Sequence, residues 1–100
     1  MALPVFAVTA LDHPNSTDKR ARLRSDHLRW LEALTNALML AGPLRQSEGG
    51  PVIGSHLMIR AHNEADLQTM LDHDPYTKGG LFASVTIAHF QPVTGAWLAS

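Results

Sequence analysis

The 100-residue chain contains no cysteine, so it can form no disulfide and offers no thiolate for catalysis or metal binding. It also lacks an apolar run of the roughly 20 residues that are needed to cross a bilayer. Residues 1–5 do not combine a basic segment with a following apolar one, so we expect no signal peptide. These absences predict a protein of the cytoplasm that has no membrane partner.

Neither sign of charge dominates the sequence. The formal net charge is −1 with the histidines neutral, whereas a protein that binds nucleic acid normally carries a basic face. Basic residues gather between residues 19 and 29, but Asp18 and Asp26 are interleaved with them, which favours a solvated helix face. We therefore expect no nucleic-acid partner.

The common signatures of cofactor and metal chemistry are missing as well. The sequence has no P-loop, no GxGxxG, no nucleophile elbow and no HExxH. The chain has six histidines, but the His56–His62 pair and the cluster at residues 72–74 match no known ligand spacing. We expect no metal and no cofactor.

What remains is the composition of an ordinary globular protein, with 45% hydrophobic and 17% charged residues. At this length we expect residues 1–100 to form a single domain. Apolar periodicity predicts strands over residues 3–10, 40–44, 54–61 and 82–90, and helices over residues 17–38 and from 64 to Asp74. Pro43 predicts a turn or bulge within its strand, and a glycine-containing loop is expected after Pro75.

The predicted order is β-α-β-β-α-β. With right-handed crossovers it gives an α+β, ferredoxin-like fold, in which a four-stranded antiparallel sheet carries both helices on one face. The strands are apolar on both sides, as at Val5 and Phe6, so the uncovered face would expose a large apolar patch. We therefore expect a homodimer, or a larger homo-oligomer, that packs sheet against sheet. The tail around Trp97 would cross to the partner.

Two ionisable residues occupy locally unfavourable positions. His27 interrupts an apolar helical stripe that contains Leu23, Trp30 and Leu31. Asp74 is predicted to end the second helix, where a carboxylate faces the negative end of the helix dipole at a cost of about 0.3–1 kcal/mol. Each residue has a plainer interpretation: His27 as a core histidine with satisfied polar atoms, and Asp74 as the start of an Asp-Pro turn.

Five sequence pieces occur in an order that is typical of one protein family. They are residues 24–28 (RSDHL), 40–43 (LAGP), 54–55 (GS), 74–76 (DPY) with 80–82 (GLF), and 85–90 (VTIAHF). The chain resembles the YCII-related (YciI-like) family of the ferredoxin-like dimeric α/β-barrel group from residue 3 to about residue 92. It departs from the family pattern at Gly79, where the family usually has alanine, and at Gln91, where the family often has a basic residue. The resemblance implies an active site built from His27 and Asp74.

In such a pair the carboxylate fixes one ring nitrogen and leaves the other free to exchange a proton. Arg24, one helical turn before His27, could bind a carboxylate or phenolate, unless it pairs with Asp26 or Asp18 on the surface. Further candidate substrate contacts are Gly42 with Pro43, through close approach to the backbone; Ser55, through its hydroxyl; and Tyr76, whose ring is otherwise a packing residue.

Two classes of function remain open. The first is a cofactor-independent lyase or isomerase that performs general acid–base chemistry on a small anionic or enolisable molecule. The resemblance implies hydroxyaromatic compounds in particular, because some family members resemble lyases that remove chloride from them. The second is a non-catalytic ligand-binding or interaction module, in which the His27–Asp74 pair is a structural hydrogen bond. A cofactor-free oxygenase is a third, weaker alternative.

Overall fold

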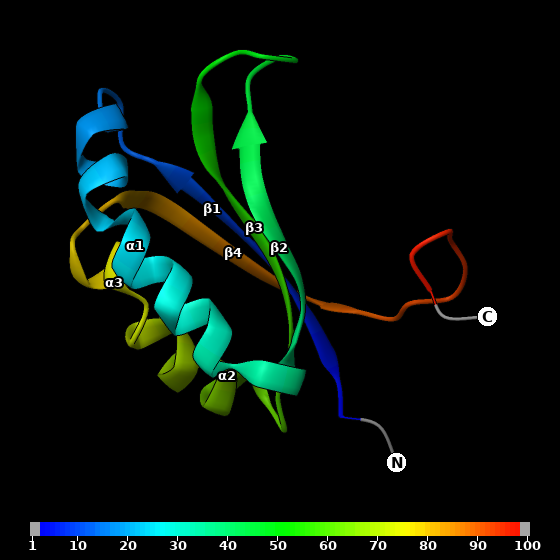
Figure 1. Cartoon of the computed structure of the whole chain (residues 1–100). Helices are drawn as coiled ribbons and strands as arrows, with labels where there is room; N and C mark the ends of the chain where they lie inside the picture. The colour runs from blue at the N-terminus through cyan, green and yellow to red at the C-terminus, as the bar shows by residue number, and fades with distance from the viewer. Residues whose placement is uncertain (1–2, 99–100) are drawn as a thin grey trace.

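The structure is a computed structural model that describes residues 3–98. Figure 1 shows the elements, which run in chain order as β1 (Val5–Asp12), α1 (Thr17–Ala33), β2 (Leu38–Arg45), β3 (Val52–Arg60), α2 (Glu64–Asp72), α3 (Pro75–Lys78) and β4 (Phe82–Phe90). A single 3₁₀ turn, Thr35–Ala37, joins α1 to β2. No helix in the described part of the chain is long and apolar enough to span a membrane.

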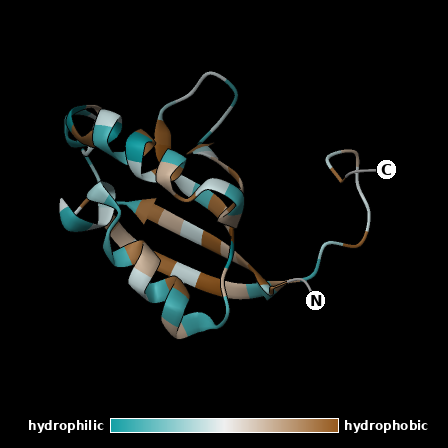
Figure 2. Ribbon diagram, turned by 60° about the horizontal axis from the view of Figure 1, so that its bottom comes forward, coloured by the Kyte–Doolittle hydropathy of each residue, from teal (hydrophilic) through white to brown (hydrophobic). Residues whose placement is uncertain are grey.

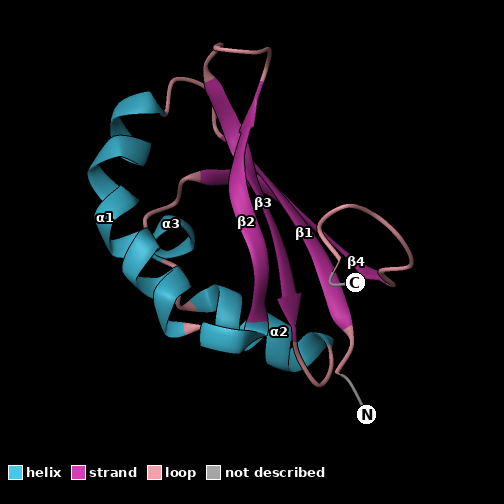
Figure 3. Ribbon diagram, turned by 45° about the vertical axis from the view of Figure 1, so that its right-hand side comes forward, coloured by secondary structure: helices cyan, strands magenta, loops and turns pink. Residues whose placement is uncertain are grey.

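The sheet has the strand order β2-β3-β1-β4, and every neighbouring pair is antiparallel. The helices cover one face of this sheet, while the opposite face is left open (Figure 3). The predicted ferredoxin-like α+β fold is therefore confirmed. Its core lies between the helices and the sheet, where Phe6 and Val8 of β1 pack with Leu57 and Ile59 of β3 and with Leu67 of α2. Figure 2 shows the hydrophobic bands along the strands that supply this core.

The alternation of β1 decides which of its side chains face the helices. Phe6, Val8 and Ala10 are at most 1% exposed, because every second residue of a strand points to the same face. The same period carries Asp12 to the helix-facing side at the end of β1, where its side chain is 6% exposed. A carboxylate thus lies in the layer between the sheet and α1.

The first helix is shorter than its periodicity predicts. The prediction over residues 17–38 is wrong at its end, because α1 stops at Ala33 and Thr35 adopts a positive φ of 49°. Leu38 continues the apolar stripe in sequence but belongs to β2, where it pairs with Ile59.

Pro43 lies within β2 without interrupting it. β2 is an edge strand whose only neighbour in the described sheet is β3, and an edge strand is where a sheet tolerates proline. Pro43 is in register with Ser55, and the irregularities of this pair lie instead between Leu38 and Leu40 and between Leu44 and Arg45. The bulge predicted at Pro43 is therefore misplaced.

The segment around Asp74 corrects two predictions. The second helix ends at Asp72, and Pro75 begins the short helix α3 where a loop was expected. Asp74 is the N-cap of α3, and its Oδ1 accepts a hydrogen bond from the backbone N–H of Tyr76 at 3.0 Å. Proline is well suited to the first position of a helix and aspartate to the cap before it. The carboxylate is thus locally stabilised by a cap, where the sequence predicted a cost from the dipole of α2.

Candidate active site

A cavity of about 240 Å³ lies between α1 and the β2–β3 side of the sheet. Every residue that the sequence analysis proposed for a site lines this cavity, except Asp74, which lies behind His27. Its wall consists of Arg20, Arg24, His27, Leu28 and Leu31 from α1, Ala41, Gly42 and Pro43 from β2, Ser55 and Leu57 from β3, and Tyr76 from α3. Residues that are up to 56 positions apart in sequence therefore meet around one space.

His27, on the wall of the cavity, forms a buried pair with Asp74. Their Nδ1 and Oδ1 atoms are 2.7 Å apart, and the two residues are 6% and 1% exposed. The Nε2 atom of His27 hydrogen-bonds to no described residue. It is not sealed from solvent either, because Arg60 Nε is the only side-chain nitrogen or oxygen of the described residues that is both fully buried and without a hydrogen-bond partner. When Nδ1–H donates to the carboxylate, Nε2 carries the lone pair on the side that reaches the cavity.

Tyr76 supports the imidazole from one side. Its ring stacks on the His27 ring with centroids 3.8 Å apart and planes 12° apart. The Tyr76 and Phe82 rings form a T-shaped pair with centroids 6.0 Å apart. Burial raises the pKa of the Tyr76 phenol, against the opposing effect of the Arg20 and Arg24 guanidinium groups. Because Tyr76 is only 2% exposed, it combines the predicted packing role with a place on the cavity wall.

Arg20 is a site residue that the sequence analysis missed. Its Nε and Nη2 each lie 2.8 Å from a carboxylate oxygen of Asp12, and Nη2 also donates to Ser55 Oγ at 3.0 Å. Its guanidinium carbon is 4.7 Å from the centroid of the Tyr76 ring. Burial opposes the charge, but the hydrogen bond and attraction to Asp12 outweigh it, so the pKa of Arg20 is raised further above its ordinary value. The expectation of a wholly solvated basic face is therefore wrong at this residue.

Arg24 differs from Arg20 in being exposed and uncompensated. It lines the cavity, and it forms no salt bridge with any residue between 3 and 98. Asp26, its proposed alternative partner, pairs with Arg29 on the helix surface instead. The cavity wall therefore holds one guanidinium neutralised by a carboxylate and one that is not.

Gly42, which was proposed for close ligand approach, and Gly54, which lies opposite β1, have different surroundings. A Cβ at Gly54 would lie 2.2 Å from the Ala10 carbonyl oxygen, so this glycine is required by the contact of β3 with β1. A Cβ at Gly42 would meet nothing within 4 Å. Of these two glycines, Gly42 alone leaves open space beside the backbone.

The polar groups of the site do not resemble a metal centre. Among residues 3–98 there is no group of three or more histidine, aspartate or glutamate side chains arranged to hold a metal ion. The pairing of His27 with Asp74 leaves His27 Nε2 without a hydrogen-bond partner among the described residues.

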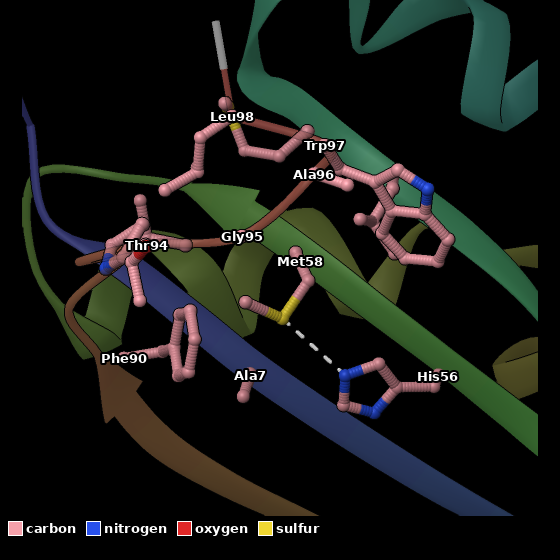
Figure 4. Close-up of a pocket in the computed structure, with 13 residues that line it drawn as sticks. Ala7, His56, Met58, Phe90, Thr94, Gly95, Ala96, Trp97 and Leu98 are labelled. Carbon is pink, nitrogen blue, oxygen red and sulfur yellow. Dashed lines mark hydrogen bonds between the residues drawn. The ribbon is translucent and has the colours of Figure 1, made fainter. Parts of the chain in front are cut away.

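A second, apolar cavity of about 530 Å³ lies on the open face of the sheet. Figure 4 shows Ala7, Met58 and Phe90 on its floor, with the tail that carries Trp97 passing above them. Trp97 is 87% exposed in the single chain. This cavity lies on the opposite side of the sheet from His27 and carries none of the acid–base groups described above.

Comparisons with known proteins agree with this fold. The family model of the YCII-related domain matches residues 5–91. A Haemophilus influenzae protein, named only as an uncharacterized protein, is 31% identical over 96 residues, which cover 88% of this chain and 97% of that protein. The solved structure of the 5-chloro-2-hydroxyhydroquinone dehydrochlorinase TftG from Burkholderia phenoliruptrix, in complex with 2,5-dihydroxybenzoquinone, is 27% identical with a TM-score of 0.81. The match covers 87% of this chain and 93% of that one. The chain therefore belongs to the YCII-related family.

Proposed function

We propose that the chain is a cofactor-independent enzyme of the lyase or isomerase type, in which His27 and Asp74 carry out general acid–base chemistry on a small anionic hydroxyaromatic or enolisable molecule. The observation that supports this best is the 2.7 Å contact between His27 Nδ1 and Asp74 Oδ1 on the wall of a cavity. One ring nitrogen is held by the carboxylate, and the other has no protein partner among the described residues.

In the proposed reaction, Nε2 of His27 takes a proton from a C–H or O–H group of the substrate. The electron pair left behind forms a new double bond. In an elimination a leaving group departs with its own bonding pair, and the imidazolium later releases the proton to solvent. In an isomerisation the imidazolium returns the proton to another carbon. The Asp74 carboxylate stabilises the imidazolium, and a positioned acid–base group of this kind contributes about 10²- to 10⁴-fold in rate.

The size and charge of the cavity support the proposed substrate class. A volume of about 240 Å³ lies below the ~300–1,000 Å³ of pockets for drug-sized ligands, which favours a single small ring. Arg24 offers an uncompensated positive charge for an anionic oxygen, while Gly42 and Pro43 form the facing wall. The similarity to a dehydrochlorinase solved with a dihydroxybenzoquinone supports a hydroxyaromatic ligand.

The open sheet face supports a second part of the proposal, that two copies of this chain pack sheet against sheet. Met39, Phe90 and Trp97 are 43%, 47% and 87% exposed on or beside this face. Contiguous exposed apolar surface of this kind marks an interaction site in soluble proteins.

The experiment compares wild-type protein with H27N on two probes. Chloride release from 5-chloro-2-hydroxyhydroquinone measures turnover, and titration with 2,5-dihydroxybenzoquinone measures binding. We expect H27N to lose at least 10²-fold in turnover while it still binds the quinone, because the proton carrier is gone and the cavity wall remains. His62→Asn, in an exposed loop, is the matched control and should change neither quantity.

Three outcomes contradict the proposal in different ways. Equal turnover by H27N and wild type would show that His27 is not the proton carrier. A wild type that binds the quinone without turnover supports the non-catalytic module, which is favoured by the near-complete burial of the pair. A wild type that neither binds the quinone nor releases chloride would exclude hydroxyaromatic compounds as the substrate class.

A further inference from the structure

A buried polar network beside the His27–Asp74 pair has no part in the chemistry proposed above. Asp12 closes β1, Arg20 lies in the second turn of α1, and Ser55 faces the helices from β3. The Arg20 and Asp12 side chains are 12% and 6% exposed, and Ser55 as a residue is 4% exposed. These three residues meet in space although they come from three separate elements.

Counting the hydrogen-bond donors in this network fixes the role of the Ser55 hydroxyl. A guanidinium group donates hydrogen bonds and accepts none. Arg20 Nη2 has two hydrogens, of which one reaches Asp12 Oδ1 at 2.8 Å and the other Ser55 Oγ at 3.0 Å. Ser55 Oγ is therefore the acceptor in its contact with Arg20, and its own hydrogen is free to be donated elsewhere.

The hydrogen of Ser55 has no acceptor among residues 3–98. Buried donors in folded proteins are nearly always paired, with protein groups, ordered water or a ligand. Ser55 lines the cavity that also contains His27 and Arg24. The direction in which this hydroxyl can still donate is thus into the cavity.

Arg20 and Arg24 differ in whether a carboxylate neutralises their charge. Asp12 neutralises Arg20 through two parallel hydrogen bonds, the geometry that holds a guanidinium most rigidly. Arg20 therefore contributes orientation and little net charge to the cavity. Arg24, without an ionic partner in the described chain, contributes the net positive charge.

We propose that Asp12 and Arg20 are positioning residues that aim the Ser55 hydroxyl into the cavity as a fixed donor to an anionic oxygen of the ligand. The ligand class is a small planar ring with a phenolate or enolate oxygen. This rests on the proposed function in one respect, that the cavity is the substrate site. Fixed donors of this kind stabilise the negative charge that grows on such an oxygen when a proton is removed nearby.

The test uses two probes of nearly equal shape, 2,5-dihydroxybenzoquinone and 2,5-dimethylbenzoquinone. The first presents ionisable ring oxygens where the second presents methyl groups. The quantity measured is the ratio of their dissociation constants for each protein variant. We expect wild type to favour the dihydroxy compound, and Ser55→Ala to reduce that preference on the order of tenfold, the value of one hydrogen bond to a charged group. Ser55→Thr keeps a hydroxyl and should restore most of it.

A double-mutant comparison separates positioning from direct contact. If Arg20 acts through Ser55, R20Q reduces the preference to the level of S55A, and the R20Q/S55A double variant falls no further. D12N, which keeps the shape but loses the charge that holds Arg20, should give an intermediate value. R22Q removes the same charge from an exposed site on α1 and should leave the ratio unchanged.

Each other outcome overturns a distinct part of the proposal. Additive losses in R20Q and S55A would mean that Arg20 contacts the ligand itself, which contradicts the positioning role. An unchanged ratio in R20Q and S55A, with only thermal stability reduced, would make the network structural. A wild type that binds both probes equally would overturn this inference, because no fixed donor then recognises the anionic oxygen. A wild type that binds neither probe would defeat the proposed function, and this inference with it.

Discussion

Asp74 makes two separate contributions to stability that substitution can separate. Its Oδ1 caps α3 through Tyr76 N at 3.0 Å and meets His27 Nδ1 at 2.7 Å, and the residue is 1% exposed. An N-cap is worth about 1 kcal/mol, and a hydrogen bond to a charged group about 1.5–3 kcal/mol. We expect D74A to lose both and to destabilise the fold by about 3 kcal/mol. In a chain of this length that lowers Tm by roughly 12–24 °C.

D74N isolates the contribution of the charge. Asparagine caps helices about as well as aspartate, so the cap remains and only the charge beside His27 is lost. We expect a cost of about 1 kcal/mol, or roughly 4–8 °C in Tm. Urea and thermal unfolding followed by circular dichroism at neutral pH measure both variants.

The control is Asp72→Ala, two residues earlier on the exposed surface of α2, which should stay within about 0.5 kcal/mol of wild type. Two results would refute the account of Asp74. A D74A variant as stable as D72A would mean that neither contact contributes. A D74N variant as unstable as D74A would mean that the cap and the charge cannot be separated in this way.

Three further predictions concern other parts of the molecule. Burial raises the pKa of the Tyr76 phenol in the folded protein. The buried neutral phenol therefore contributes its full stability below about pH 10, and this contribution is lost as the pH rises through the folded-state pKa. The phenolate absorbance of this single tyrosine measures the shift. Substitution R20Q should raise that pKa further, because it removes a cation that lowers it, and a fall would contradict the assigned cause. Gly54→Ala should destabilise the fold by about 1–3 kcal/mol in urea unfolding, since its Cβ would lie 2.2 Å from a carbonyl oxygen, whereas Gly42→Ala should be nearly neutral; equal values would refute the packing argument. Sedimentation should show a wild-type dimer that Phe90→Glu converts to monomer, and a monomeric wild type would refute the sheet-to-sheet proposal.

The fold could be predicted from periodicity because the burial pattern is local. The apolar run of β1 and the alternation in β3 and β4 located these strands, and the order of elements then left one simple topology. The boundary near Leu38 could not be predicted in this way, since an apolar residue fits a helical stripe and a buried strand equally well. The change of direction depends on the positive φ of Thr35, which periodicity does not register.

The site was only partly predictable because its members are assembled by tertiary contacts. Asp74 was identified through its position before Pro75, although that same pair is the signature of a cap followed by a first helical residue. Arg20 was overlooked among other basic residues, yet it lies four and seven positions before Arg24 and His27, on one helix face. The pairing of Arg20 with Asp12 could not be predicted, because it depends on how the end of β1 is placed against α1 in the folded protein.

The central claim is that His27 presents Nε2 to a ligand while Asp74 holds Nδ1. Nitrogen-15 NMR of the His27 ring, recorded with and without 2,5-dihydroxybenzoquinone, tests it most directly. The account predicts that the Nε2 resonance shifts on addition of the quinone and that the Nδ1 proton remains hydrogen-bonded. In D74N the Nδ1 signal should change even without the quinone. A His27 ring whose two nitrogen signals do not move when the quinone binds would contradict the claim.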